Sequence, residues 1–237
     1  MPQRISRRLF LTVAAGAMAA PQIVLGREEA PNVLDHILLG CSDLDHGIDF
    51  VEKRIGVRAA FGGVHPGRGT RNALFSLGEK HYLEIIAPDP QQSGAPDRYG
   101  LEKLTEPRLV GWAAHPGDLD KFATRLRDAN IAFEGPLPGS RQRPDGRLLQ
   151  WKTLHLKDDL GGVLPFFIEW SADTIHPSTD APAGCHIVHF ALRGTNEPEL
   201  TGISKLLGLD VDIARGAKPE LHARIAGPNG RVMDLAS

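Results

Sequence analysis

The sequence predicts an α+β fold in which one unit, a strand followed by a helix and about three more strands, occurs three times. Each unit opens with a strand-like apolar run, continues into an amphipathic helix, and closes on an apolar strand that carries a carboxylate. The closing carboxylates are Glu84, Glu169 and Asp234. An acid is costly to bury without a partner charge or a metal, so their recurrence indicates carboxylates directed into a cavity.

The first unit begins with a strand run over residues 33–39. Its helix follows after Ser42 or Asp43, either of which is a suitable N-cap. Gly56 is placed to end this helix. Apolar residues recur at the spacing of one helix face: Leu44, Ile48, Val51 and Ile55.

The second and third units repeat this order. Residues 109–114 and 187–192 are their opening strand runs, and a helix with one apolar face follows each run. In the third unit Pro198 lies in the first helical turn and Gly208 follows the last, which is the usual asymmetry of a helix. The chain therefore divides into a signal and leader, two full modules and a partial third module: 1–30, 31–104, 105–182 and 183–237.

The N-terminal segment resembles an export signal. Arg7 and Arg8 stand before a mildly apolar run over residues 12–20, and Ala17 to Ala19 matches an A-x-A cleavage site. We interpret it as a twin-arginine signal, which predicts a periplasmic protein; the alternative is an ordinary basic amphipathic N-terminus. The run is too short, and too rich in alanine and glycine, to span a bilayer.

Composition argues against several classes of partner. The formal net charge is −2, and no cluster of Lys and Arg beyond the signal indicates nucleic-acid binding. No internal apolar run approaches the length of a membrane span. Cys41 and Cys185 either pair in an oxidising compartment or remain buried thiols. The expected partner is a small-molecule substrate, and the odd number of modules favours self-association as a homodimer.

Several short motifs occur in an order that one known superfamily shares. They are Leu34-Asp35-His36, Asp43-Leu44-Asp45, residues 67–74, Tyr82-Leu83-Glu84, residues 139–146 with Trp151, and Ile168-Glu169-Trp170. With these motifs the chain resembles the vicinal oxygen chelate superfamily, and within it the glyoxalase-like domain group. The resemblance covers residues 33–172 and extends more weakly to the rest.

The resemblance implies a glyoxalase/bleomycin-resistance-like fold in which βαβββ modules work in pairs. Curved mixed sheets would close around a cavity, and the first and fourth strands of each module would supply metal ligands. Carried over residue by residue, it implies ligands at His36, Glu84 and Glu169, with Gly111 at the fourth position. The implied cofactor is a divalent metal ion: Zn, Ni, Mn or Fe.

A second ligand set arises if the first module faces the third. His189 and Asp234 stand in the third unit where His36 and Glu84 stand in the first, which would give two imidazoles and two carboxylates. We favour pairing of the first two modules, because neighbouring elements usually pack together. The third module would then cover a barrel edge or mediate a dimer, with His189 on an edge strand and Asp234 a solvated acid.

Structural roles also account for the first ligand set. The alternative for His36 is a core histidine bonded to Asp35 or to a backbone carbonyl. The alternative for Glu84 and Glu169 is a buried ion-pair core with Arg71, Arg141 or Arg143 as partners.

The arginine-rich segment 141–147 contains the turn signature Pro144-Asp145-Gly146. If this hairpin lies at the mouth of the cavity, Arg141 or Arg143 would bind a carboxylate or an enediolate through two parallel hydrogen bonds. Trp151 would then form an apolar wall. The alternative is a solvated basic turn.

Asn72, at the end of the segment 67–72, is a further candidate for substrate binding. This glycine-rich segment resembles a phosphate-binding loop only superficially, because it lacks the lysine and precedes a strand rather than a helix. It predicts a hairpin instead.

These residues predict an exported, metal-dependent enzyme of isomerase or lyase type that acts on a small oxygenated substrate. The metal would bind two adjacent substrate oxygens, and Glu169 or Glu84 would move the proton as general base. One alternative is a metal-free protein of the same fold that binds or sequesters a small molecule, which the absent ligand at Gly111 favours. A second alternative is a ring-cleaving dioxygenase, which needs two histidines and one carboxylate.

Overall fold

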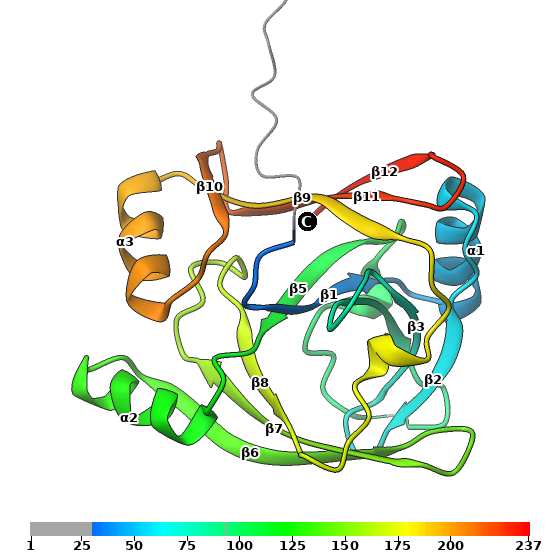
Figure 1. Cartoon of the computed structure of the whole chain (residues 1–237), viewed down its shortest axis with the longest axis horizontal. Helices are drawn as coiled ribbons and strands as arrows, with labels where there is room; N and C mark the ends of the chain where they lie inside the picture. Colours follow the sequence, from blue (N-terminus) through cyan, green and yellow to red (C-terminus); the bar gives the residue numbers. More distant parts are fainter. Residues whose placement is uncertain (1–29, 93) are drawn as a thin grey trace, which may run out of the picture.

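The computed structural model describes residues 30–92 and 94–237 of the 237-residue chain. The predicted export signal falls on residues outside this described part. Two sheets organise the fold: one of eight strands that curls around a cavity, and one of four strands that packs against the outer side of the first (Figure 1). The predicted α+β class with repeated modules is confirmed.

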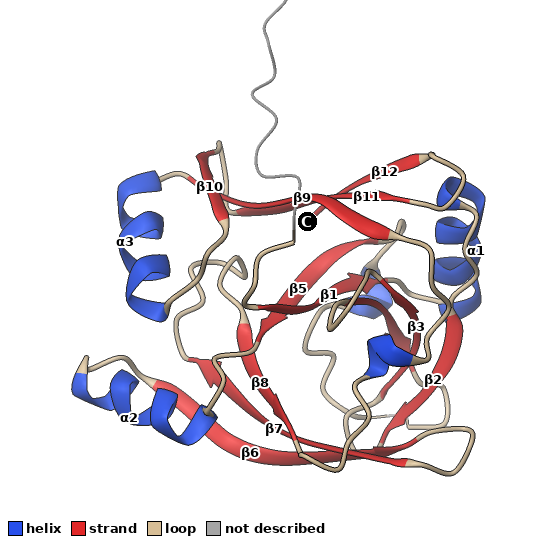
Figure 2. Cartoon of the chain, viewed as in Figure 1, coloured by secondary structure: helices blue, strands red, loops and turns tan. Residues whose placement is uncertain are grey.

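Each of the three segments has the element order strand, helix and three strands (Figure 2). The first contains β1 (Leu34–Gly40), α1 (Leu44–Ile55), β2 (Ala60–His65), β3 (Thr70–Ser76) and β4 (Tyr82–Pro88). The second contains β5 (Arg108–Ala114), α2 (Leu119–Asp128), β6 (Phe133–Gln142), β7 (Leu148–Leu156) and β8 (Phe166–Trp170). The third contains β9 (His186–Gly194), α3 (Glu197–Leu207), β10 (Asp212–Arg215), β11 (Glu220–Ala226) and β12 (Val232–Ala236). Two short 3-10 helices lie in the connections: η1 (Leu101–Lys103) and η2 (Pro177–Thr179).

The three α-helices begin at capping side chains. Asp43, Asp118 and Asn196 each accept a hydrogen bond from a backbone N–H of the first turn. Such a cap satisfies one of the free N–H groups at a helix start. The N-cap of α1 is therefore Asp43 and not Ser42, the other candidate from the sequence. Gly56 and Gly208 end α1 and α3 with φ of 78° and 76°, a conformation that glycine adopts without strain.

The first and second segments share the eight-stranded sheet. Its strand order is β2-β3-β4-β1-β5-β8-β7-β6, and the antiparallel pairing of β1 with β5 joins the two halves. The edge strands β2 and β6 approach each other, and the Arg141 guanidinium on β6 donates a hydrogen bond to the Gly62 carbonyl on β2. The two modules that are adjacent in sequence thus enclose one cavity.

The third segment has the predicted element order but a different strand order, β10-β9-β11-β12. In the first module the closing strand β4 pairs directly with the opening strand β1. In the third, β11 lies between the opening strand β9 and the closing strand β12. The Cα atoms of His189 and Asp234 are therefore two strand spacings, about 10 Å, apart. The pair does not reproduce the His36–Glu84 arrangement, in which the two strands are neighbours.

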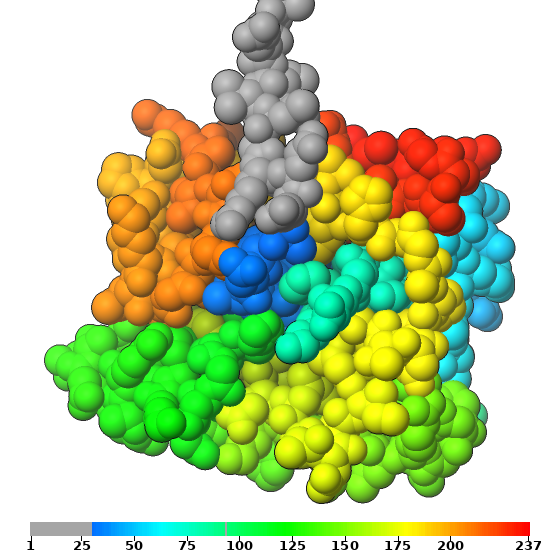
Figure 3. Space-filling model, viewed as in Figure 1, coloured from blue at the N-terminus to red at the C-terminus, as the bar shows by residue number. Residues whose placement is uncertain are grey.

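One hydrophobic core lies between the outer face of the curled sheet, helices α1 and α2, and the four-stranded sheet. Trp112 of β5 is fully buried in this core, where it packs edge-on against Phe190 of β9 with ring centroids 5.1 Å apart. Its indole N–H donates to the Val163 carbonyl at 2.8 Å. Figure 3 shows the third segment, coloured from yellow through orange to red, packed directly on the first two. The fold therefore buries the third segment's apolar face against the paired modules.

Cys41 and Cys185 are buried free thiols. Burial raises their pKa values to about 12 and about 11 respectively. Of the two alternatives that the sequence left open, the structure thus shows unpaired thiols. Within the described residues, no helix is both long enough and apolar enough to cross a lipid bilayer.

Two neighbouring leucines of α3 test the docking of the third segment. Leu207 is 3% exposed in the shared core, whereas Leu206 is 54% exposed. We expect Leu207→Ala to lower the free energy of unfolding by about 2–5 kcal/mol, because it leaves a cavity. Leu206→Ala should change it by about 0.5 kcal/mol or less. Urea unfolding measures both, and equal losses would show that α3 does not dock as described.

Candidate functional site

The inner face of the eight-stranded sheet encloses a cavity of about 470 Å³. Because side chains alternate along a strand, every second residue of β4 and of β8 faces this cavity. The first module contributes His36, Tyr82 and Glu84 to one wall, which we call the polar wall, and the second contributes Trp151, Ile168 and Trp170 to an apolar wall. The second module also adds polar groups to the cavity, among them Arg141 and Thr153.

Glu84 is the buried carboxylate of the polar wall, with 6% of its surface exposed. The Asn72 amide donates to its Oε1 at 2.7 Å. His36 Nε2 lies 3.4 Å from Oε2, and His65 Nε2 lies 3.6 Å from Oε1. Burial alone would raise the pKa of Glu84, but that pKa is lowered overall. The lowering of the pKa comes from His65 only at the acidic pH where that imidazole is protonated, and otherwise from His36, the Asn72 hydrogen bond and Arg141. Glu84 is therefore ionised at neutral pH.

Asp35 fixes the orientation of His36. Its Oδ1 lies 2.6 Å from His36 Nδ1, and its Oδ2 accepts from the Trp170 indole at 2.9 Å and lies 3.3 Å from His176 Nε2. Burial would raise the pKa of Asp35, but these hydrogen bonds and the nearby histidines lower it. An ionised Asp35 accepts the Nδ1–H of His36, so that His36 Nε2 faces Glu84.

A β-bulge places Asp35 and His36 together. Successive residues of a regular strand face opposite sides of the sheet, yet these two neighbours share a hydrogen bond. The pairing of β1 with β5 shifts register between Leu34 and His36, which leaves Asp35 unpaired in the ladder. A bulge redirects side chains in this way and is common beside active sites.

His65 is a cavity residue that the sequence analysis missed. Its Nδ1 lies 2.8 Å from the Thr70 hydroxyl, and its Nε2 lies 3.4 Å from the Asn72 amide nitrogen. Burial, with help from Arg141 and Arg68, lowers its pKa to about 4, so it is neutral at pH 7. The sequence contained a signal for this placement. His65 pairs with Thr70 across the predicted hairpin, and Thr70 is two residues from the candidate Asn72, so the three residues lie close together.

Glu169 is not brought together with His36 and Glu84. Its Oε2 accepts the Leu119 N–H at 2.6 Å, at the start of α2 on the outer side of the sheet. The prediction placed this ligand one residue out of register. His36 pairs with Tyr82 in the first module, whereas Ala113 pairs with Phe166 in the second.

That register decides which residues replace the family ligands in the second module. Two residues beyond each pair, Ile168 stands where Glu84 stands. Ala113, rather than the expected Gly111, stands where His36 stands. Neither replacement has a ligating atom.

The predicted substrate-binding residues divide between the cavity and the surface. Arg141, Trp151 and Asn72 line the cavity, and Arg141 is only 4% exposed. Arg143 does not reach the cavity, because its Nη1 binds Asp180 Oδ1 at 2.7 Å near the protein surface. Alternation alone would place both arginines on one face, since they are two residues apart. They differ because β6 ends at Gln142 and Arg143 already belongs to the turn.

The alternative ligands His189 and Asp234 lie outside the cavity, on the four-stranded sheet. His189 Nε2 is 3.2 Å from Asp212 Oδ2, and Asp234 accepts from Arg224 Nε at 2.9 Å. Each is thus held by a partner on its own sheet. The alternative ligand set is not formed, because the strand order of the third segment keeps its members apart.

The residues present do not fit the metal centre that the resemblance implied. Two of its four positions are apolar, which leaves His36 and Glu84. His65 supplies a third donor, but the Asn72 amide nitrogen lies between Glu84 Oε1 and His65 Nε2, at 2.7 and 3.4 Å. Within residues 30–92 and 94–237, no group of three or more His, Cys, Asp or Glu side chains is arranged to hold a metal ion.

Comparison with known families agrees with this architecture. A family model described as "Glyoxalase-like domain" matches residues 34–207. The chain belongs to the glyoxalase-like domain family. The match covers both paired modules and reaches the end of α3, which confirms the predicted membership of the glyoxalase-like domain group.

Several solved structures are similar to this chain. A hypothetical protein from Staphylococcus aureus is 17% identical with a TM-score of 0.61, over 85% of this chain and 84% of that one. Methylmalonyl-CoA epimerase from Mycobacterium tuberculosis is 22% identical with a TM-score of 0.44, over 65% and 94%. The Streptomyces coelicolor epimerase is 21% identical with a TM-score of 0.44, over 62% and 99%. A search of curated proteins found no match.

The buried histidines predict how stability depends on pH. Burial is the main cause that lowers the pKa values of His65 and His155 from 6.5 to about 4. Between these values the unfolded chain binds protons that the folded chain does not, so the free energy of unfolding should fall as the pH drops through this window. We expect His65→Gln to make the fall shallower, as measured by urea unfolding at several pH values.

The exposed His46 on α1 provides the control for this experiment. His46→Gln should leave the slope of stability against pH as it is in the unmodified protein. A His65→Gln slope equal to that of the control would contradict the assignment of His65 to the buried, neutral form.

Proposed function

We propose that this protein is an enzyme of isomerase or lyase type that moves a proton at a carbon next to the carboxylate or carbonyl group of a small anion. One observation carries the proposal: an ionised, buried carboxylate, Glu84, lies between two imidazoles in the cavity. The cavity also holds Arg141, which has no carboxylate within ion-pair distance among residues 30–92 and 94–237. Paired titratable groups in a closed cavity are typical of acid–base sites.

The unsatisfied groups of the cavity support an anionic, oxygen-rich substrate. Three cavity residues have buried polar atoms without a hydrogen-bond partner among the described residues: Arg141 Nε, Asn72 Oδ1 and Thr153 Oγ1. Leaving such groups unpaired costs about 1–3 kcal/mol each. Arg141 is the guanidinium closest to the acid–base cluster and suits a substrate carboxylate. A bound anion would accept hydrogen bonds from Arg141 Nε and the Thr153 hydroxyl, whereas Asn72 Oδ1 is an acceptor and would need an N–H or O–H of the substrate.

Each residue of the cluster has a separate role in the proposed reaction. Glu84 accepts the proton from the substrate carbon, and the electron pair of the broken C–H bond moves onto the adjacent carbonyl oxygen. Arg141 stabilises the negative charge that develops there. His36, held by Asp35, exchanges a proton with the substrate or with Glu84 through Nε2. Positioned proton transfer of this kind contributes about 10²–10⁴-fold to a rate.

The apolar wall supports a second candidate function, a binding protein without catalysis. Trp151 and Trp170 pack edge-on with centroids 5.5 Å apart, and Phe166 and Ile168 continue the wall. Such a surface suits an aromatic or otherwise apolar ligand body. Both functions predict ligand binding, but only the enzyme exchanges substrate protons with water.

Location and assembly remain part of the proposal. The N-terminal sequence supports export to the periplasm, and the odd number of modules supports a homodimer. A periplasmic site would favour a substrate that does not depend on a reduced thiol cofactor.

Solvent exchange tests the proposed chemistry. We would incubate the protein in D2O with a panel of small 2-oxo acids and follow loss of the proton next to the carbonyl group by ¹H NMR. Glu84→Gln should slow exchange about 100-fold or more, because the amide does not accept the proton. Glu169→Gln is the matched control, since Glu169 lies on the outer face and glutamine keeps an acceptor for Leu119. Binding without exchange across the panel would favour the second candidate.

Metal dependence is tested with the same assay. Because the donor set does not fit a metal centre, we expect exchange to persist after dialysis against EDTA and to change less than about twofold when Mn²⁺ or Zn²⁺ is restored. Elemental analysis of the dialysed protein accompanies the measurement. Loss of exchange on dialysis, with recovery on addition of one metal, would instead establish a metal-dependent enzyme with His36 and Glu84 as ligands.

A further inference from the structure

Tyr82 is a buried residue of β4 to which the proposed reaction gives no role. It is 3% exposed and lines the cavity on the same face of β4 as Glu84, two residues before it. Among residues 30–92 and 94–237 its hydroxyl has no hydrogen-bond partner. Because a buried phenol usually finds such a partner, this hydroxyl is a donor that a bound molecule can use.

Two rings hold the Tyr82 phenol in place. The His36 imidazole stacks on it with ring centroids 4.5 Å apart and an interplanar angle of 19°. The His176 ring meets it edge-on at 5.6 Å. The phenol is therefore positioned by ring packing beside the acid–base groups. Phenylalanine in its place would keep both ring contacts and remove only the oxygen.

The surroundings of the Tyr82 hydroxyl keep the proton on the phenol. Burial raises the pKa of Tyr82 well above its usual range, and the carboxylates of Asp35 and Glu84 act in the same direction. Arg141 is the cation that acts against them, and Tyr82 and Arg141 each influence the pKa of the other. Tyr82 is therefore a neutral hydrogen-bond donor that lies within electrostatic reach of both Glu84 and Arg141.

We propose that Tyr82 is a catalytic residue whose hydroxyl donates a hydrogen bond to the substrate oxygen that becomes negative when Glu84 removes the proton. The phenol keeps its own proton throughout, so the step needs no further acid or base. A donor that is fixed before the reaction stabilises the charge of the transition state more than the neutral carbonyl of the ground state. This inference rests on the proposed function for the reaction, whereas recognition of a negatively charged oxygen by Tyr82 does not require catalysis.

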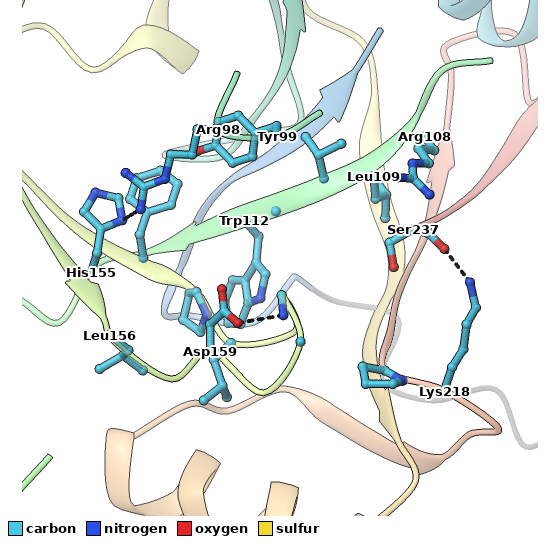
Figure 4. A pocket seen from close by; sticks show the side chains of 18 residues that line it. Arg98, Tyr99, Arg108, Leu109, Trp112, His155, Leu156, Asp159, Lys218 and Ser237 are labelled. Carbon is cyan, nitrogen blue, oxygen red and sulfur yellow. Dashed lines mark hydrogen bonds between the residues drawn. The ribbon is translucent and has the colours of Figure 1, made fainter. Parts of the chain in front are cut away.

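A second hollow of about 410 Å³ beside the cavity provides the control for an anion-binding experiment (Figure 4). Arg108 lines this hollow and not the cavity, whereas Arg98 lines both. Figure 4 shows Arg108 on the side of Lys218, and Arg98 beside His155 on the other. Arg108→Gln would therefore weaken an anion bound in the second hollow and leave one bound beside Tyr82 unchanged.

Oxalate and oxamate are the probes for the Tyr82 hydroxyl. Both have the shape of a small 2-oxo acid, but oxalate carries a negative charge at the place of the enolate oxygen, where oxamate carries a neutral amide. We would measure both affinities by isothermal titration calorimetry. Tyr82→Phe should weaken oxalate about tenfold or more and oxamate about threefold, because a hydrogen bond to a charged acceptor is the stronger one. Arg108→Gln should leave both affinities unchanged.

Proton exchange with a 2-oxo acid in D2O gives a second readout. Tyr82→Phe should lower kcat about 100-fold and change KM about twofold or less, because the hydrogen bond strengthens in the transition state. Circular dichroism and the thermal midpoint establish that each variant is folded.

The two readouts separate this inference from the proposed reaction. An unchanged kcat in Tyr82→Phe, absence of oxalate binding, equal loss of oxalate and oxamate affinity, or an equal loss of oxalate affinity in Arg108→Gln would each overturn the role of Tyr82. Absence of exchange in the unmodified protein, with the selective loss of oxalate affinity intact, would instead refute the proposed reaction and leave recognition of a charged oxygen by Tyr82 standing.

Discussion

The antiparallel pairing of β1 with β5 is the contact on which the rest of the molecule depends. It joins two four-stranded halves into one sheet, and the twist of that sheet brings the edge strands β2 and β6 together. A cavity exists only because the sheet closes in this way. The same closure carries Arg141 from β6 to the first module, where it binds the Gly62 carbonyl and faces Glu84 across the cavity. Neither module alone would enclose a site.

The polar wall of the cavity is a balance between desolvation and local partners. Burial opposes the charged forms of Asp35 and Glu84, yet neighbouring histidines and hydrogen bonds keep both carboxyl groups ionised. Burial also keeps His65 neutral. Groups with unlike charge states thus coexist within hydrogen-bonding reach, which is the condition for proton transfer. The bulge at Asp35 contributes the geometry, because it lets a carboxylate and the next residue's imidazole meet on one side of a strand.

The two modules have diverged in what they place at equivalent positions. The first keeps His36 and Glu84, whereas the second offers Ala113 and Ile168 beside aromatic side chains. The site is accordingly one-sided, with acid–base groups on one wall and an apolar surface on the other. The third segment does not line the cavity. Its apolar face packs on the outer core, and its different strand order separates His189 from Asp234. Repetition of sequence therefore does not imply repetition of function here.

Local sequence determined the helices, their caps and the order of elements within each segment. It also placed His36, Glu84 and Asn72 at inward-facing positions. These features follow from residue periodicity and helix capping, which act over only a few residues. It did not determine the register of β8. A one-residue shift turns every side chain of a strand to the other face, and for this reason Glu169 was predicted to face the cavity when it lies on the outer side. It also did not reveal His65 or the contact of Arg141 with the Gly62 carbonyl, although it did offer Asp35 as a partner of His36. These depend on contacts between residues far apart in the chain, and only the closed sheet brings them together.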